Sequence, residues 1–289
     1  MGIGFSPDLT RTMSNNVERG FEMVLKIYQQ NMCGYSISGN KTSGELNERE
    51  CNALNGLMKI VKEETPNVIF LSEVSHNLYK KIISEEVFTG YEIKQPSGGI
   101  DEDDTTACLV ILKKEHQYEC KERNSIFLNK RYIEGTLKIN YSFELECFFA
   151  YVPQCDICVK EDILLKPQVR KKVIYYQDRV EQKAEMLFGA YLFWLENKDK
   201  NVFIGGDLNT DLGDEEARCK SIFEQLYNEM EDTLSDKVEN IKTWKKEMFD
   251  KEKCLDYALV SKSVNCTTMY IKREVTGSDH KGLLSTIIF

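Results

Sequence analysis

Acceptor-rich side chains stand where apolar segments of this chain end. Glu73 closes the continuously apolar run 67–73, Asp207 closes the similar run 201–207, and Asn31 ends an earlier alternating run. A single such residue is most simply a turn former or a cap, because carboxylates are rarely buried unless they are paired or metal-bound. Repetition at several strand ends instead predicts that these side chains converge on one cleft.

Further polar residues extend the pattern towards the end of the chain. Asn209 follows the second apolar run, Asp256 lies inside the strand-like run 254–260, and Asp279 and His280 precede the last apolar run. Convergent carboxylates and amides form the oxygen-rich site that Mg²⁺ or Mn²⁺ prefers, which suits metal-assisted cleavage of phosphate esters. Ser278 does not complete a serine-hydrolase triad, since adjacent residues cannot align in a relay and no GxSxG segment is present.

The segments that must position these residues read as a mixture of strands and helices. Strands are expected at 24–31, 67–73, 108–112, 132–139, 145–151, 201–207, 255–260, 267–272 and 283–289. Helices are expected up to Pro66, at about 77–86, along a long segment after 168, and at about 214–227. Because the order lacks a strict βαβα rhythm, two packed sheets with helices outside is the favoured α/β architecture.

The long helix is predicted from an apolar stripe at helical spacing. The stripe consists of Val173, Tyr176, Val180, Ala184, Leu187, Phe188, Tyr191 and Leu195. We expect this face to pack against the core.

Composition narrows the class of protein. The 289 residues carry 38 Lys+Arg against 47 Asp+Glu, a net charge of −9, and 42% are hydrophobic, which excludes global disorder. No apolar run approaches the ~18 residues of a membrane span. The acidic balance argues against a broad basic surface for nucleic acid, but it leaves room for a local groove or for a bound metal.

The N-terminal segment and the cysteines bear on domains and compartment. Residues 1–22 are polar and are expected to form a flexible lead-in before a single domain, 23–289, in a monomer. The lead-in lacks the apolar run of a secretory signal, so ten scattered cysteines indicate reduced thiols in a cytoplasmic or nuclear protein rather than a secreted one. Cys155 and Cys158 form a lone CxxC, which without a second pair is interpreted as loop cysteines.

Taken in order, these motifs resemble the endonuclease/exonuclease/phosphatase (EEP) superfamily, which shares the fold of DNase I. The matching segments are Asn31, Leu71-Ser-Glu73, Gly206-Asp207-Leu-Asn209, Leu255-Asp256-Tyr257 and Ser278-Asp279-His280. The resemblance spans residues 24–289 and implies a four-layered α/β sandwich, with two packed mixed β-sheets flanked by helices.

The resemblance also implies roles for the first group of residues. Glu73 would be the principal ligand of Mg²⁺ or Mn²⁺, helped by Asn31 and Asp279. Asp207 would activate or orient the attacking water, and Asn209 would position that water or the phosphate.

A second group would act on the phosphate. His280 would donate a hydrogen bond to a phosphate oxygen as an imidazolium, and Asp256 would pair with its other ring nitrogen. Tyr151, followed by Val-Pro-Gln, resembles the abasic-site endonuclease and exonuclease III branch, in which the phenol contacts the scissile phosphate. Trp244 resembles the aromatic segment that many members place near the substrate.

Other positions depart from that branch. Ser72 and Ser75 stand where abasic-site enzymes usually carry Gln and Lys, and Lys281 after Asp-His is also seen in inositol polyphosphate phosphatases. Arg170 and Lys171, downstream of Tyr151, are candidate phosphate contacts. We therefore expect a metal-dependent phosphodiesterase with DNA or RNA as substrate; an inositol-phosphate or lipid-headgroup phosphatase and a non-catalytic EEP binding domain are the alternatives.

Overall fold

Two six-stranded sheets form the centre of the molecule. The computed structural model describes residues 23–33, 45–102, 104, 106–123, 130–140, 143–154, 167–215, 217, 219–234, 242–246 and 251–289. The division into a lead-in 1–22 and one domain 23–289 stays a prediction, and Cys155 and Cys158 lie outside the described residues.

The first sheet has the strand order β13-β14-β1-β2-β4-β3. Its strands are β1 (Val24–Asn31), β2 (Val68–Val74), β3 (Tyr91–Lys94), β4 (Ala107–Lys113), β13 (Asn265–Ile271) and β14 (Gly282–Ile288). The parallel pair β1 and β2 sits among antiparallel neighbours, so the sheet is mixed.

The second sheet has the order β5-β6-β7-β8-β12-β9 and is also mixed, because only β7 and β8 run parallel. Its strands are β5 (Gln117–Lys121), β6 (Tyr132–Asn140), β7 (Phe143–Tyr151), β8 (Val202–Asp207), β9 (Glu231–Asp232) and β12 (Asp256–Val260). A separate two-stranded ribbon joins β10 (Trp244–Lys246) and β11 (Lys251–Lys253).

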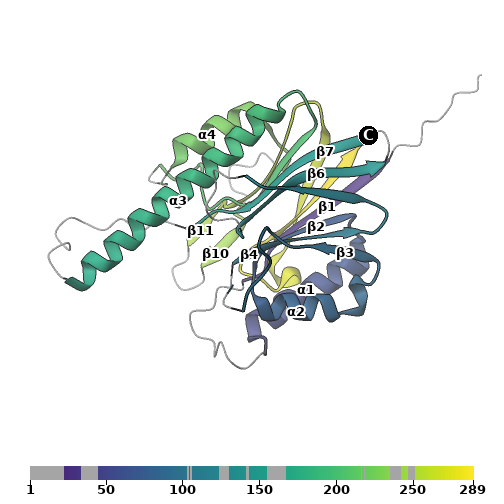
Figure 1. The fold of residues 1–289 in the computed structure, drawn as a ribbon, viewed down its shortest axis with the longest axis horizontal. Helices are drawn as coiled ribbons and strands as arrows, with labels where there is room; N and C mark the ends of the chain where they lie inside the picture. Colours follow the sequence, from purple (N-terminus) through teal and green to yellow (C-terminus); the bar gives the residue numbers. More distant parts are fainter. Residues whose placement is uncertain are drawn as a thin grey trace, which may run out of the picture.

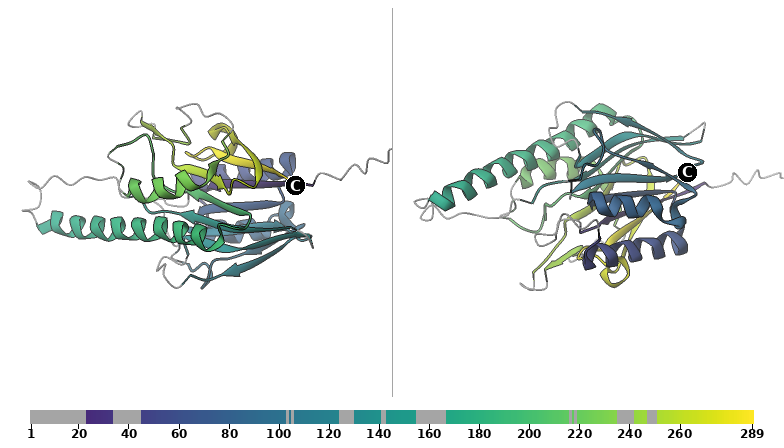
Figure 2. Two further views of the ribbon diagram at one scale, coloured as in Figure 1. Left: turned by 90° about the horizontal axis from the view of Figure 1, so that it is seen from above. Right: turned by 60° about the horizontal axis from the view of Figure 1, so that its bottom comes forward.

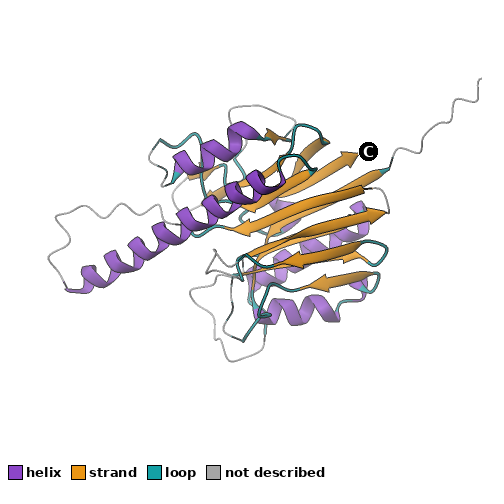
Figure 3. Ribbon diagram, turned by 45° about the horizontal axis from the view of Figure 1, so that its top comes forward, coloured by secondary structure: helices purple, strands orange, loops and turns teal. Residues whose placement is uncertain are grey.

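Helices cover both outer faces of the paired sheets (Figures 1 and 3). Helices α1 (Glu48–Glu64) and α2 (His76–Ser84) pack on the first sheet, and α3 (Pro167–Asn197) and α4 (Lys220–Glu229) pack on the second. The short helices are η1 (Glu86–Phe88) and α5 (Arg273–Thr276). The predicted four-layered α/β sandwich is therefore confirmed. None of the helices in the described part of the chain has the length and apolar composition of a membrane span.

Between the sheets lies an aromatic core. Phe70 of β2 stacks on Phe149 of β7 and on Phe203 of β8, with ring centroids 4.8 and 6.3 Å apart. All three side chains are buried. This packing fixes the carboxyl ends of the parallel strands relative to one another across the two sheets.

Helix α1 is anchored at its ends and along one side. Asn47 and Glu50 form a capping box at its start, and Thr65 in a left-handed conformation ends it just before Pro66. Gly56 allows close approach of α5, because an added Cβ would collide with the Thr276 carbonyl. This close packing of α5 on α1 fixes the position of the segment that follows α5 and carries Asp279 and His280.

The buried face of α3 differs in part from the predicted stripe. Phe188 and Leu195 are exposed, at 49% and 43% of their surface. Of the predicted stripe, Leu187 is buried, Val180, Ala184 and Tyr191 are partly buried, and the side chains of Val173 and Tyr176 lie outside the described residues. The other buried residues in the described part of α3 are Lys183, Met186, Gly189, Ala190, Phe193, Trp194 and Asn197. The helix is apolar on two adjacent faces, and packing against β7 and β8 selected the face that also carries a lysine and an asparagine. The amino-terminal part of α3 extends beyond the sheets (Figure 2).

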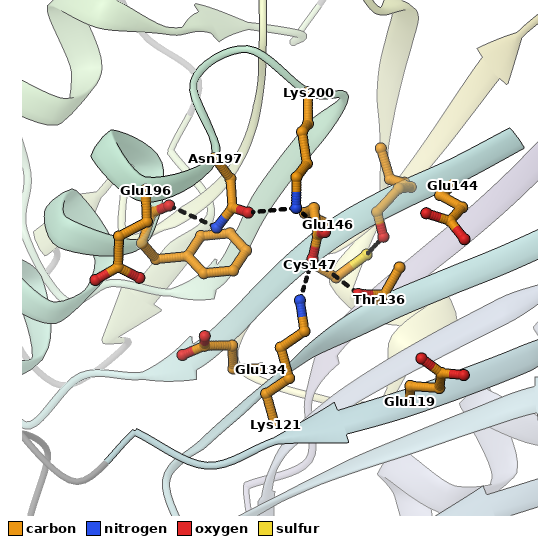
Figure 4. A network of polar contacts seen from close by, with 12 residues as sticks. Glu119, Lys121, Glu134, Thr136, Glu144, Glu146, Cys147, Glu196, Asn197 and Lys200 are labelled. Atoms are coloured by element: carbon orange, nitrogen blue, oxygen red, sulfur yellow. Dashed lines mark hydrogen bonds and ion pairs between the residues drawn. The ribbon is translucent and has the colours of Figure 1, made fainter.

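An ion-pair network centred on the buried carboxylate of Glu146 fastens the carboxyl end of α3 to the second sheet (Figure 4). Glu146 of β7 accepts bonds from Lys121 and Lys200, each at 2.7 Å, and from Thr136 at 2.9 Å. Lys200 also donates to Asn197 at the end of α3. Burial by itself would raise the pKa of Glu146, but the hydrogen bonds from Lys121 and Lys200 outweigh it and lower that pKa.

We expect Glu146→Gln to lower the free energy of unfolding by about 1–3 kcal/mol at neutral pH, because the isostere loses two ion pairs at a buried position. The folded pKa of Glu146 is depressed below the ordinary value of a glutamate, so this stabilisation is present above that ordinary value and is lost as pH falls through the folded pKa. Urea unfolding at several pH values should show the difference between the proteins shrinking in acid. Glu144→Gln, at an exposed position of the same strand, is the control; equal losses in both variants would contradict the expectation.

Candidate active site

The polar strand ends converge at one edge of the sandwich. In the second sheet, Tyr151, Asp207 and Asp256 occupy adjacent register positions on β7, β8 and β12. From the first sheet, Asn31 at the end of β1 donates its Nδ2 hydrogen to Asp207 Oδ2 at 3.0 Å. The cluster thus spans both sheets, as the strand-end pattern predicted.

Asp207 is the most buried member of this cluster, with 1% of its surface exposed. Its Oδ1 accepts the backbone N–H of Asn209 at 3.1 Å, which caps the turn that follows β8. Burial raises the pKa of Asp207 well above its usual range, and the nearby charges of Asp256 and Glu73 add to this while His280 opposes it. A carboxylate with a raised pKa is a stronger proton acceptor than an exposed aspartate.

His280 and Asp256 form a buried pair. His280 Nδ1 lies 2.8 Å from Asp256 Oδ2, and the other ring nitrogen, Nε2, lies 3.8 Å from Asp207 Oδ2. Burial alone would lower the pKa of His280, but the two carboxylates raise it to about 10. The ring is therefore an imidazolium at neutral pH. Nε2 is beyond hydrogen-bond distance of Asp207 Oδ2 but close enough to it that one ligand atom beside the two could bond to both.

Local hydrogen bonds hold the segment that carries His280. Its backbone N–H donates to Ser278 Oγ, and its carbonyl accepts from Thr276 Oγ1. Trp244 of β10 pairs with His280 in an isolated antiparallel bridge. Thr243, just before β10, accepts the backbone N–H of Asp256 with its Oγ1, so Thr243 and Trp244 contact both partners of the buried pair.

Glu73 lies at an irregularity of β2. The register between β2 and β4 shifts between Leu71 and Val74, and Glu73 has a left-handed φ of 52°. A left-handed non-glycine residue is uncommon and often marks a functional position. The Tyr151 hydroxyl forms a hydrogen bond with the Glu73 side chain, and burial together with the charges of Glu73 and Asp207 raises the pKa of Tyr151.

A thiol lies beside the other predicted metal ligands. Cys33 Sγ donates to Asp279 Oδ1 at 2.7 Å and lies 2.9 Å from Ser278 Oγ, while its backbone N–H donates to Asn31 Oδ1 at 2.9 Å. Burial and the charges of Asp279 and Glu73 raise the pKa of Cys33. This neutral thiol therefore connects Asn31 and Asp279, which come from distant parts of the chain.

The donor chemistry of this edge fits a hard divalent cation. Glu73 and Asp279 offer carboxylate oxygens and Asn31 an amide oxygen, which are the ligands Mg²⁺ and Mn²⁺ prefer. The ligand atoms of Asp207, Asp256 and His280 also lie within 4.8 Å of one another, but the pairing of His280 Nδ1 with Asp256 suits an orienting role better than metal ligation.

Of the three predicted substrate contacts, the structure describes the side chain of Trp244 but only the backbone of Arg170 and Lys171. Trp244 is half-buried and adjoins His280 through its backbone. Arg170 and Lys171 lie in α3, and their side chains lie outside the described part of the chain. The roles assigned to all the site residues stay predictions.

Two residues at this edge had not been predicted. The guanidinium of Arg131 lies over the Tyr151 ring, 5.1 Å from its centroid, and Cys33 contacts Asp279. Arg131 precedes a strand without any motif, so nothing local marks it. Cys33 stands two residues after Asn31, and this proximity was the available signal.

Solved structures of known proteins resemble this chain over 90% or more of its length. TDP2 from D. rerio, in a humanized form, matches with a TM-score of 0.61 and 17% identity over 91% of this chain and 98% of its own. An AP endonuclease from Archaeoglobus fulgidus matches at 0.58 and 17%, over 90% and 98%. The mannosyl-6-phosphatase Bt3783 of Bacteroides thetaiotaomicron matches at 0.60 and 14%, over 92% and 100%.

The chain has the EEP fold. An endonuclease/exonuclease/phosphatase family protein from Bacteroides thetaiotaomicron shares it as well, with a TM-score of 0.60 and 13% identity over 93% of this chain and 98% of its own. No family model and no curated protein matches the sequence. At these identities the likeness establishes the EEP fold, and the activity must be argued from the site.

Proposed function

We propose that the protein is a Mg²⁺- or Mn²⁺-dependent phosphodiesterase that hydrolyses nucleic-acid phosphodiester bonds. The observation that carries the proposal is the meeting of the Asn31–Asp207 and Asp256–His280 hydrogen-bonded pairs in one buried cluster. Oxygen donors for a cation lie at the same edge. A solved TDP2 structure with the same fold holds a single-strand DNA product, which supports nucleic acid as the substrate class.

The residues divide the chemistry between them. Glu73, Asn31 and Asp279 would hold the cation, which when bound supplies positive charge against the phosphate and its leaving oxygen. His280 as an imidazolium donates from Nε2 to a phosphate oxygen, and Asp256 keeps the ring oriented. Asp207, held in place by the Asn31 amide, accepts a proton from the attacking water.

The alternative phosphatase function rests on Lys281, which follows Asp279-His280. Its Nζ lies 4.2 Å from the centroid of the Tyr270 ring on β13, and burial with the charge of Arg273 lowers its pKa. This cation–π contact holds the Lys281 ammonium against Tyr270 on β13, the edge strand of the first sheet. Phosphodiester hydrolysis is therefore favoured over the phosphatase function.

One hydrolysis assay with a panel of substrates distinguishes the phosphodiesterase from the phosphatase function. Labelled single- and double-stranded DNA and RNA are incubated with the protein in Mg²⁺ or Mn²⁺, beside inositol phosphates, mannose 6-phosphate and EDTA controls. We expect cleavage of the oligonucleotides, and we expect EDTA to abolish it. Phosphate release from the monoesters with intact oligonucleotides would establish the phosphatase, and no hydrolysis of any substrate would refute both.

A further inference from the structure

A lysine is buried beneath the turn that follows β8. Lys183 of α3 has none of its surface exposed, and its Nζ donates to the backbone carbonyl of Asn209 at 2.6 Å. Its neighbours on that helix face, Met186 and Leu187, are apolar core residues packed in the same cluster as Leu208. An ammonium at such a position is costly, and an apolar side chain of similar length would fill the space without that cost.

The turn above Lys183 is held in an unusual conformation. Asn209 has a left-handed φ of 47°, its backbone N–H donates to Asp207 Oδ1, and its Nδ2 donates to the Val152 carbonyl at 2.8 Å. The next carbonyl, that of Thr210, accepts from the Tyr257 hydroxyl at 2.8 Å. Lys183 and Tyr257 thus each bond one carbonyl of the turn after β8, and these two bonds oppose its relaxation.

We propose that Lys183 is a positioning residue, which fixes the turn from Asp207 to Asn209 and so aligns the Asp207 carboxylate. The charge-assisted bond to the Asn209 carbonyl is stronger than a neutral one and acts from the helix behind the turn. Lys183 does not touch substrate and acts through Asn209. The kinetic part of this inference rests on the proposed function, whereas the conformational part does not.

The test compares Lys183→Met with Lys198→Met, an exposed lysine just beyond the end of α3. The methionine keeps the length and apolar stem of Lys183 but lacks the donor. We expect amide hydrogen exchange of residues 208–211 to accelerate at least tenfold in Lys183→Met alone. Its kcat should fall by about ten- to a hundredfold, the effect of a small misplacement of a catalytic group, while KM stays unchanged.

Unchanged exchange and unchanged kcat in folded Lys183→Met would overturn the proposal. Equal acceleration across the whole of β8 and α3 would also overturn it, since that result indicates general loosening. If Lys183→Met fails to fold, Lys183→Gln, a polar side chain that lacks the charge and the full length of lysine, is measured by the same criteria. Faster exchange at 208–211 in Lys183→Met, when the wild-type protein cuts no phosphoester, would refute the proposed function and leave the conformational role of Lys183 standing.

Discussion

Replacing His280 by alanine is expected to lower kcat/KM for phosphodiester hydrolysis by on the order of a thousandfold, because it removes a charged donor to the developing negative charge. The Asp256 and Asp207 carboxylates hold the pKa of His280 at about 10, so the wild-type ring is charged throughout the neutral range. Steady-state kinetics on a labelled oligonucleotide measures the loss.

Two further variants make the His280 result specific. Asp256→Asn keeps the shape of the partner but removes its charge, so activity should fall by less than in His280→Ala. His116→Ala, whose imidazole bonds Asn67 and the Ile139 carbonyl in a different part of the fold, controls for loss of a buried ring. Near-normal turnover of folded His280→Ala would refute the assigned role.

The substitution Glu73→Gln is expected to weaken Mn²⁺ binding and to lower activity by on the order of a thousandfold, since the amide keeps the shape of the side chain but removes the charge that a cation requires. Isothermal calorimetry with Mn²⁺ measures the first effect without reference to any substrate. The Tyr151 hydroxyl, which bonds the Glu73 side chain in the wild type, can still donate to the oxygen of the substituted amide, so the fold should be preserved.

The control for this experiment is Glu63→Gln, at an exposed position of α1. It should bind Mn²⁺ and turn over substrate as the wild type does. If Glu73→Gln binds the cation as tightly as the control, the metal site has been assigned to the wrong residues. Tight binding with lost activity would instead place Glu73 in the chemistry alone.

The sequence determined the elements around the site because local patterns carried that information. The alternating run ending at Asn31 forms β1 with the expected bounds, and the apolar runs ending near Glu73 and Asp207 form β2 and β8 within a residue or two. Each strand buries its apolar residues regardless of which strand it pairs with, so hydrophobic periodicity was enough to predict where the strands lie. The polar residues at the strand ends followed from the same pattern.

Only the tertiary structure decided which side chains meet. The register that sets Asp256 opposite Asp207, and the contact of Cys33 with Asp279, join residues far apart in the chain. The packing of α3 likewise placed Lys183, which is not part of the predicted stripe, in the core. Such pairings depend on how whole sheets and helices pack against each other, and no local pattern encodes that packing.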